Sequence, residues 1–187
     1  IEKNKQKIFK ENEALFVCLA AAYLNESDFN DFLDHYPDID INGVVEDREV
    51  TPLICSILNN ESDTLGIILN RFKDVDVNYK TSDNITALHL ISKKYFSEKL
   101  WSKMNDSILL FLKKNPNPNI QDSEEYNTPL HYAQILLDLP NINVNISNKA
   151  RFTPLRIFEK NLCYFARFSM EESVSILEGF AKHQKLQ

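Results

Sequence analysis

Apolar stretches with helical spacing alternate with polar loops along most of the chain. Four similar phrases are predicted to open helices: TPLICSI (51–57), TALHLIS (86–92), TPLHYAQ (128–134) and TPLRIFE (153–159). The stretches before them, DINGVVEDREV, DVNYKTSDNI, PNIQDSEEYN and VNISNKARF, have the composition of turns. Residues 11–42 lack the phrase but show the periodicity of a helix–turn–helix unit. The pattern therefore predicts an all-α chain of repeated helical units.

Each residue type in the phrase has a physical reason to stand where it does. Thr is expected to cap the helix by accepting a hydrogen bond from a backbone N–H of the first turn. Pro at the first helical position loses no needed donor, because that N–H has no partner within a helix. The following Leu is expected to point into the core.

The phrases recur in phase with an asparagine. Thr51 and Thr128 each stand nine residues after an Asn, and Thr86 and Thr153 stand eight residues after one. The asparagines at these positions are Asn42, Asn78, Asn119 and Asn145. Recurrence at nearly constant spacing is the mark of a stacked repeat architecture.

These units resemble ankyrin repeats, for which Thr-Pro-Leu-His-x-Ala is the defining stretch. TPLHYA (128–133) matches at every fixed position, and TALHLI (86–91) departs from the motif at Pro and Ala. Asp76, Asn78, Asp83 and Thr86 also fall where the family places Asp, Asn, Asp and Thr. The resemblance implies an all-α, ankyrin-repeat solenoid of stacked helix–turn–helix units with β-hairpin-like loops. The resemblance covers roughly residues 11–183, and we expect a single ankyrin-repeat domain, 1–187, with approximate units 11–42, 43–78, 79–119, 120–145 and 146–183.

Several positions depart from the family pattern. The turn glycine is replaced by Asn84 in one repeat and by Arg151 in another. Asn tolerates left-handed backbone, whereas Arg at this position calls that turn geometry into question. Ile54 and Arg156 stand where the motif has His.

Two neighbouring units differ in length from the others. Thr86 to Asn119 spans 33 residues and Thr128 to Asn145 spans 17, against 27 from Thr51 to Asn78. Both changes are expected after the first helix, on the convex back that the family resemblance implies, so that the concave binding side survives. We hypothesise that large apolar side chains of YFSEKLWSKM (95–104) cover the gap behind the short unit: Phe96, Leu100, Trp101 and Met104. The alternative is a local extension that packs only on its own repeat.

Composition restricts the classes of partner. The 187 residues carry a net charge of −6, which argues against nucleic acid because phosphate binding draws on clustered Lys and Arg. FVCLAAAYL (16–24) is well short of the ~18 apolar residues of a membrane span. The three cysteines, Cys18, Cys55 and Cys163, are far apart in apolar surroundings, which favours buried reduced thiols. A monomer in the cytoplasm is expected, or in the host cytoplasm if the chain is an effector.

The sequence gives little support for catalytic groups. Thr-x-x-His at 86–89 and 128–131 could suggest a nucleophile and a base, but the resemblance implies that this His ties hairpins together. His131 is therefore predicted to be structural. Glu124 and Glu125 are paired carboxylates, but neighbours on an exposed turn are expected to be solvated rather than metal-bound. We expect no enzyme, no cofactor and no metal. The competing hypothesis, a hydrolase using His131 or Cys55, requires those groups to be open to solvent beside a cleft.

A protein-binding surface is the favoured interpretation, because a solenoid offers an extended concave face made of hairpin tips and first helices. The loop tips are acidic through the middle of the chain, where Asp122, Glu124 and Glu125 lie, and basic towards the C-terminal end. This distribution of charge predicts a protein partner with a basic region. The tyrosines among the candidate residues are expected to act as aromatic anchors of the kind found at binding hot spots. The candidate residues are Tyr79, Lys80, Asp83, Glu124, Glu125, Tyr126, Tyr132, Lys149, Arg151 and Arg156.

A second function hypothesis places the catalysis elsewhere. Because the chain begins with Ile1, we expect an excised segment with flanking domains. The chain would then be the targeting or substrate-recruitment region of a larger protein, such as a host-directed microbial or viral effector, whose catalytic domain lies outside this segment.

Overall fold

The computed structural model describes residues 2–58, 64–97, 106–133, 136–137, 139, 141–164 and 170–184, and within them the regular structure is helical. In chain order the helices are α1 (Glu2–Glu11), α2 (Glu13–Tyr23), α3 (Glu26–His35), the 3-10 turn η1 (Glu46–Arg48), α4 (Pro52–Leu58), α5 (Thr64–Arg71), α6 (Ala87–Ser97), α7 (Asp106–Lys113), α8 (Pro129–Tyr132), α9 (Pro154–Tyr164) and α10 (Met170–Gln184). Between the described residues, β pairing is limited to an isolated antiparallel bridge, Val45 with Val50. The predicted all-α class is confirmed.

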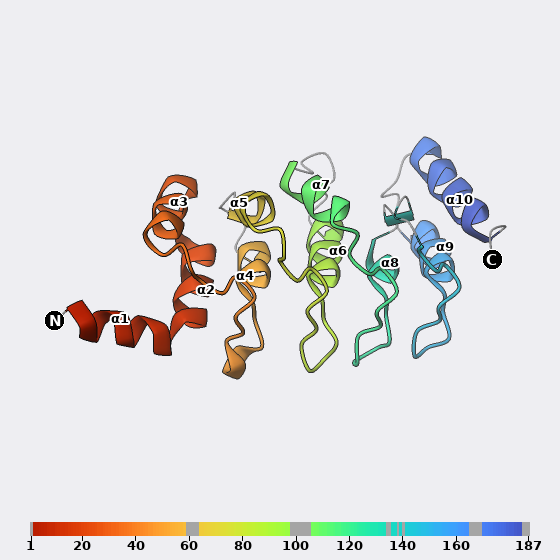
Figure 1. Ribbon diagram of the computed structural model, residues 1–187. Coiled ribbons are helices and arrows are strands. Elements are labelled where there is room, and N and C mark those ends of the chain that lie inside the picture. The colour runs from red at the N-terminus through yellow and green to blue at the C-terminus, as the bar shows by residue number, and fades with distance from the viewer. Residues whose placement is uncertain are drawn as a thin grey trace. The chain divides into compact units, whose positions relative to one another are not determined.

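The chain, whose helices are labelled in Figure 1, divides into two compact units. Unit 1 comprises Ile1–Thr81 with Met104–Lys114, and unit 2 comprises Ser82–Lys103 with Asn115–Gln187. The predicted repeat boundaries do not coincide with this division, since α6 and α7 fall in different units although both lie in the predicted repeat 79–119. The single ankyrin domain over 1–187 stays a prediction.

Unit 1 is built around paired helices. α2 packs on α4, and α5 packs on α3 and α7, so apolar side chains from several helices share one core. Its fully buried large side chains include Phe29, Ile68 and Phe111. α1 precedes the predicted repeats and is held by Phe9, whose ring stacks on Tyr36 with centroids 4.1 Å apart.

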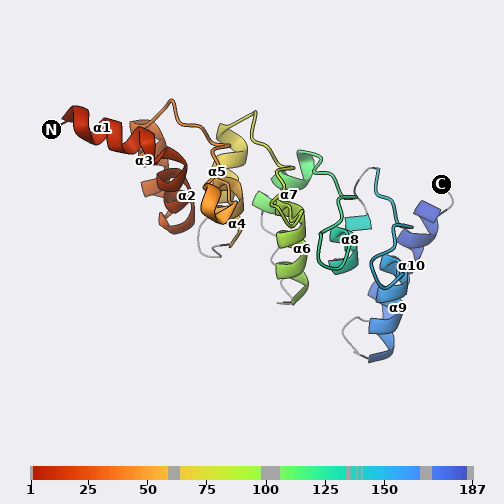
Figure 2. The same ribbon diagram turned by 90° about the horizontal axis from the view of Figure 1, so that it is seen from below.

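Unit 2 stacks α6, α8 and α9 in that order, and α10 lies beside α9 (Figure 2). Leu88, Leu130 and Phe158, one from each stacked helix, are fully buried. Phe180 of α10 meets Phe158 with ring centroids 6.3 Å apart. The C-terminal helix therefore closes one end of the apolar core of this unit.

The helices open as the repeated phrase predicts. The hydroxyls of Thr51, Thr86 and Thr153 accept hydrogen bonds from the backbone N–H three residues later, at 3.3, 3.4 and 3.3 Å. Thr128 and His131 form a reciprocal capping box at the start of α8. Because one orphan backbone donor of each first turn is satisfied in this way, the predicted role of Thr is confirmed.

The recurring asparagines belong to a second local motif, an Asp or Asn, a buried apolar residue, and then Asn. In each copy the first side chain accepts a hydrogen bond from the backbone N–H of the last residue. The pairs are Asp40–Asn42 (2.9 Å), Asp76–Asn78 (2.8 Å), Asn117–Asn119 (3.0 Å) and Asn143–Asn145 (2.9 Å). Such a side chain closes a turn in place of a backbone carbonyl, which explains why the spacing to Thr is nearly constant.

Two of these asparagines also bridge to the following loop. In unit 1 the Asn42 amide donates to the carbonyl of Asp74 at 2.9 Å and accepts from the N–H of Asp76 at 2.8 Å. In unit 2 Asn119 makes the same pair of bonds, to Asn141 at 2.8 Å and from Asn143 at 2.8 Å. A primary amide suits this place because it carries a donor and an acceptor on one side chain.

The residue two positions before each Thr is left-handed in all four copies. Glu49, Asn84, Tyr126 and Arg151 have φ of 51°, 56°, 56° and 62°. The doubt that the sequence raised about Arg151 is therefore resolved in favour of the turn, which keeps its geometry without glycine. Left-handed backbone in a residue with a Cβ costs ~1–2 kcal/mol, so these loops store strain.

The short fourth repeat differs from the expectation. Its first helix, α8, has only 4 residues, against 7 in α4 and 11 in α6. The shortening thus reaches the first helix and is not confined to the back, because the backbone leaves the helical region at Ala133, with φ −148°.

The side chains proposed to cover the gap behind this repeat, Phe96, Leu100, Trp101 and Met104, lie outside what the structure describes, so that hypothesis stays a prediction. Among the described residues, α10 contributes to the cover. His183 Nε2 lies 2.5 Å from the carbonyl oxygen of Leu137, and a Cβ added at Gly179 would come within 2.9 Å of Leu137 Cδ1. Gly179 therefore permits a close approach at this point.

Candidate protein-binding surface

Three loops of unit 2 lie side by side and are joined through their backbones. The N–H of Ser123 donates to the carbonyl of Asp83 at 2.9 Å, and the N–H of Lys149 donates to the carbonyl of Glu125 at 2.8 Å. We call residues 83–84, 123–126 and 148–151 the unit 2 tips. Figure 1 shows these loops projecting to the same side of the helices of unit 2. Since each loop is fixed to its neighbour, the tips form one continuous surface.

Asp122 holds the middle tip from within. Its side chain is 1% exposed and accepts hydrogen bonds from the N–H groups of Glu125 (3.0 Å) and Asn127 (3.2 Å) and from the Tyr132 hydroxyl (2.5 Å). Burial alone would raise the pKa of Asp122, but these bonds, led by that of Tyr132, hold it below its usual value. Asp122 was expected to add its charge to the acidic tip together with Glu124 and Glu125. That expectation was wrong, because the carboxylate is buried and accepts hydrogen bonds from donors within the protein.

Tyr132 supports the tip and is not a free aromatic anchor. It is half-buried, its hydroxyl donates to Asp122, and Lys93 Nζ lies 4.6 Å from the centre of its ring. Burial, followed by the Asp122 hydrogen bond, raises the pKa of Tyr132, so the phenol stays protonated. Tyr132, which was predicted to contact the partner, would therefore act by positioning the residues of the middle tip.

The two motif histidines tie each loop to the next. His89 Nε2 lies 3.2 Å from the carbonyl oxygen of Asn127, and His131 Nε2 lies 3.0 Å from that of Phe152. In both rings Nδ1 accepts from the backbone N–H of the capping Thr, at 3.3 and 3.0 Å. The proton must then be on Nε2, which makes both rings neutral donors.

Burial favours this neutral form. It lowers the pKa of His89 from 6.5 to about 4 and lowers that of His131 as well. His131 is 4% exposed and both its nitrogens are engaged. The predicted structural role is confirmed in its geometry, and the requirement of the competing hydrolase hypothesis for an open His131 is not met.

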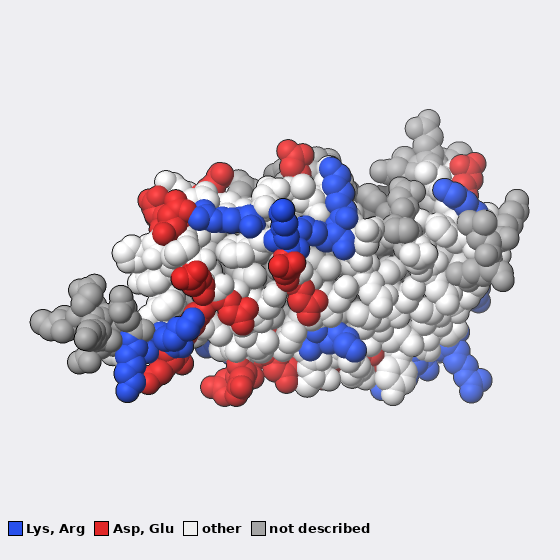
Figure 3. Space-filling view, in the orientation of Figure 1, with Lys and Arg blue, Asp and Glu red and all other residues white. Residues whose placement is uncertain are grey.

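The unit 2 tips carry opposite charges at neighbouring places. Glu124 and Glu125 are exposed on the middle tip, and Lys149 and Arg151 are exposed on the last one. Lys149 Nζ lies 3.2 Å from the Glu124 carbonyl oxygen, which draws the two tips together. In Figure 3 basic atoms gather along the lower edge over the loop that precedes α9. A partner that places a cation over the middle tip and an anion over the last would complement this surface.

The remaining candidate residues are placed differently. Asp83 is exposed on the first tip, and Tyr126 is exposed (52%) on the middle one. Arg156 stands on α9 and pairs with Glu159 at 3.3 Å. Tyr79 and Lys80 belong to unit 1, where Tyr79 is half-buried and its pKa is raised by burial and then by the charge of Glu49. The unit 2 surface described here therefore does not include Tyr79 or Lys80.

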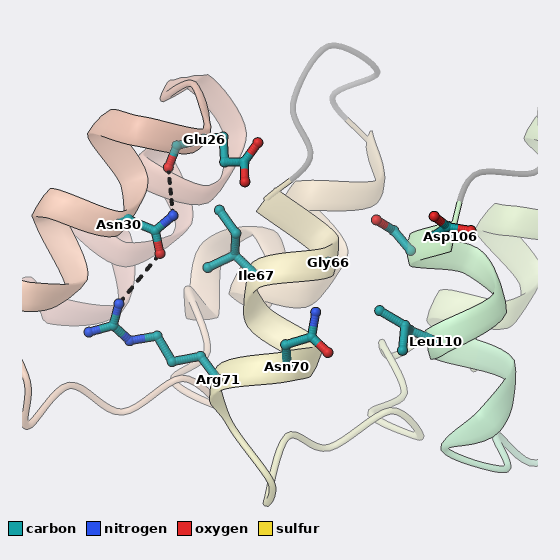
Figure 4. A pocket seen from close by; sticks show the side chains of 9 residues that line it. Glu26, Asn30, Gly66, Ile67, Asn70, Arg71, Asp106 and Leu110 are labelled. Carbon is teal, nitrogen blue, oxygen red and sulfur yellow. Dashed lines mark hydrogen bonds between the residues drawn. The ribbon is translucent and has the colours of Figure 1, made fainter.

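A cavity of about 570 Å³ in unit 1 is the main alternative site (Figure 4). It lies between α3, α5 and α7, and Gly66 forms part of its wall where α5 approaches Ser107 of α7. The Arg71 guanidinium is already bound to Asp34 and to Asn30 Oδ1 at 3.4 Å. The residues that line the cavity include neither His nor Cys, and the charge of its Arg71 is already paired.

Neither a cluster of metal ligands nor a helix able to span a membrane is found among the described residues. Three or more His, Cys, Asp or Glu side chains do not gather anywhere within these residues closely enough to hold a metal ion. Each helix within the described ranges is too short or too polar to traverse a bilayer.

Sequence reasoning missed Asp122 as a support and Gln121 as a link. Gln121 Nε2 donates to the carbonyl oxygens of Tyr126 (2.6 Å) and Ser147 (3.1 Å), on two different loops. The Asp or Asn that opens each turn motif was also missed as a repeated element. Its signal was present, since an Asp or Asn precedes each recurring Asn by two residues.

Comparison with known proteins adds no assignment to this geometry. The sequence matches no protein-family model, and no curated protein shows significant similarity to it.

Proposed function

We propose that the chain is a non-catalytic protein-interaction module and that its partner binds across the unit 2 tips. The observation that carries the proposal is the left-handed backbone at Tyr126 and Arg151, whose side chains are both exposed. Glycine would occupy these positions without strain. Strained residues with outward side chains, held by an over-determined scaffold, are typical of functional sites.

Three further features support this proposal. The resemblance to ankyrin repeats implies binding through hairpin tips. The tips are fixed by backbone hydrogen bonds and by the buried Asp122, so little ordering entropy would be lost on binding. The opposed charges of Glu124 and Arg151 would select a partner by orientation and speed its association. Cys18 and Cys55, both free thiols, fit a reducing compartment, and we place the module in the cytoplasm.

The test separates strain from binding by replacing the two left-handed residues with glycine. Tyr126→Gly and Arg151→Gly should each leave the free energy of unfolding unchanged or raise it, by up to ~1 kcal/mol, since the positive φ no longer costs energy. Both should weaken binding. Peptides that bind the wild-type protein are selected from a displayed library and measured by calorimetry against each variant.

Charge variants sharpen the same experiment. Glu124→Lys with Glu125→Lys should weaken the selected peptides without unfolding the protein, because exposed tips contribute little to stability. Asp31→Lys with Glu178→Lys, on α3 and α10, changes the net charge equally at two exposed helical positions and should leave binding intact. If the tip variants bind normally, or the helical pair abolishes binding, the proposed surface is wrong.

A further inference from the structure

A second cavity in unit 1, of about 400 Å³, lies between α2, the 45–50 hairpin and α4. Its walls include large apolar side chains that are unusually exposed: Leu15 (40%), Leu19 (43%), Tyr23 (76%) and Leu58 (57%). Arg48 is the cationic residue of the lining, and Cys18 and Cys55 are its two sulfur groups. An apolar recess that contains a cation and two thiols is a different kind of site from the charged tips of unit 2.

The two thiols are partners of unequal accessibility. Cys18 on α2 is 3% exposed and Cys55 on α4 is half-buried, and neither is in a disulfide. Both side chains lie in the wall of the same cavity. The Cys18 thiol also lies within 3.8 Å of the carbonyl oxygen of Val50, which has no proton to give. Cys18 is therefore the donor in this contact, and Cys55 is the more accessible of the two thiols.

Electrostatics act on the two sulfurs in opposite directions. The neighbouring Cys18 lowers the pKa of Cys55 against the opposing effect of burial, and the charge of Arg48 lowers it further. The neighbouring Cys55, together with burial, raises the pKa of Cys18. Thiolates and not thiols are nucleophiles, so Cys55, which is the more accessible thiol and has Arg48 in the same cavity wall, is the member that reacts first.

We propose that Cys55 and Cys18 are the attacking and resolving thiols of a site that an organic hydroperoxide oxidises to a disulfide. The Cys55 thiolate attacks the terminal oxygen of the hydroperoxide, the O–O bond breaks, and the alkoxide leaves and takes a proton to become an alcohol. Cys55 is then a sulfenic acid. Cys18 then gives up its proton and its thiolate sulfur attacks the Cys55 sulfur, so that the S–O bond breaks and the hydroxide takes up that proton and leaves as water.

The surroundings favour an organic hydroperoxide over hydrogen peroxide. Leu15, Leu19 and Leu58 give an alkyl chain an apolar surface, and burying each methylene contributes ~0.8 kcal/mol. Arg48 is positioned to stabilise the alkoxide as it forms. The product disulfide would link α2 to α4, the helices that pack together in the core of unit 1.

The experiment uses the whole chain with Cys163→Ser, which leaves Cys18 and Cys55 as its two cysteines. The reduced protein is treated with linoleic acid hydroperoxide or with hydrogen peroxide, and disulfide formation is followed by intact mass. We expect an intramolecular disulfide, forming at least ~10-fold faster with the lipid hydroperoxide, since two buried methylenes alone would supply that factor. Equal rates with the two oxidants, a disulfide between two molecules, or no disulfide would overturn the proposal.

Variants assign the two roles. With Cys18→Ala, a sulfenic acid should persist on Cys55 and be trapped by dimedone. With Cys55→Ala, oxidation of Cys18 should slow at least ~10-fold, one pKa unit being tenfold in thiolate. Oxidation of Cys18 at an unchanged rate would exclude Cys55 as the attacking thiol.

Two further measurements guard against damage to the fold. Leu58→Gln, at an exposed position, should reduce the preference for the lipid hydroperoxide, whereas Arg71→Gln, in the other cavity of unit 1, should not. Alkylation of the unmutated pair by iodoacetamide at several pH values needs no core substitution. Cys55 should react at lower pH than Cys18, and the reverse order would overturn the assignment.

Discussion

Acidification from pH 7 to pH 4 should destabilise the protein through His89. This ring is fully buried, and it is a neutral donor between the capping Thr86 and the carbonyl of Asn127. Protonation would place a hydrogen on Nδ1, where the N–H of Thr86 already points, and would bury a charge. The folded protein therefore resists taking up a proton that the unfolded chain accepts freely.

The magnitude follows from the two pKa values. His89 has a pKa of about 4 in the folded protein, against 6.5 for an unperturbed side chain. Because the folded pKa is the lower one, stability is complete above pH 6.5 and is lost as the pH falls from 6.5 to about 4. A difference of ~2.5 units at 1.36 kcal/mol each corresponds to a loss of about 3 kcal/mol. His131 shifts in the same direction and adds to the loss.

The assay is urea unfolding by circular dichroism at several pH values between 7 and 4, together with NMR titration of the histidine ring protons. His89→Gln has no titratable ring and should show a shallower dependence on pH than the wild type. A His89 resonance that titrates near 6.5, or a free energy of unfolding that is as large at pH 4.5 as at pH 7, would refute the reasoning.

Two more predictions concern buried polar partners. Tyr132→Phe removes the hydroxyl that donates to Asp122 and should cost about 1.5–3 kcal/mol of unfolding free energy, the range for a hydrogen bond to a charged group. In a double-mutant cycle with Asp122→Asn the two losses should be non-additive, and simple additivity would contradict the proposed support of the tip. His131→Ala should lower the melting temperature, because the Phe152 carbonyl and the Thr128 N–H lose their partner at ~1–3 kcal/mol. Unchanged stability in thermal scans would show that the ring is dispensable.

The helix caps and turns of the fold were predictable because they depend on residues that are close in sequence. Thr caps its own helix three residues on, and Pro suits the first turn, so four phrases were enough to place α4, α6, α8 and α9. The asparagine spacing likewise signalled repeated turns. The number of residues in α8 was not predictable, since its end at Ala133 depends on how the short repeat packs.

The candidate site was predicted less completely. Exposure of Glu124, Glu125 and Tyr126 at a loop tip agrees with what the polar turn suggested. The burial of Asp122 could not be inferred, because its partners include Tyr132, which lies ten residues away on the next helix. The thiol pair could not be inferred from the sequence for the same reason, because Cys18 and Cys55 line one cavity only when α2 packs on α4.

The amide bridges of Asn42 and Asn119 have a consequence for how such a chain can change in evolution. Each bridge joins one loop to the next through groups that lie within the loops themselves. The alignment of the loops therefore does not require a fixed number of residues between them. Insertions and deletions after the first helix can accumulate while the loops stay in register. The chain carries both kinds of length change between Thr86 and Asn145, yet the links that join successive unit 2 tips are intact.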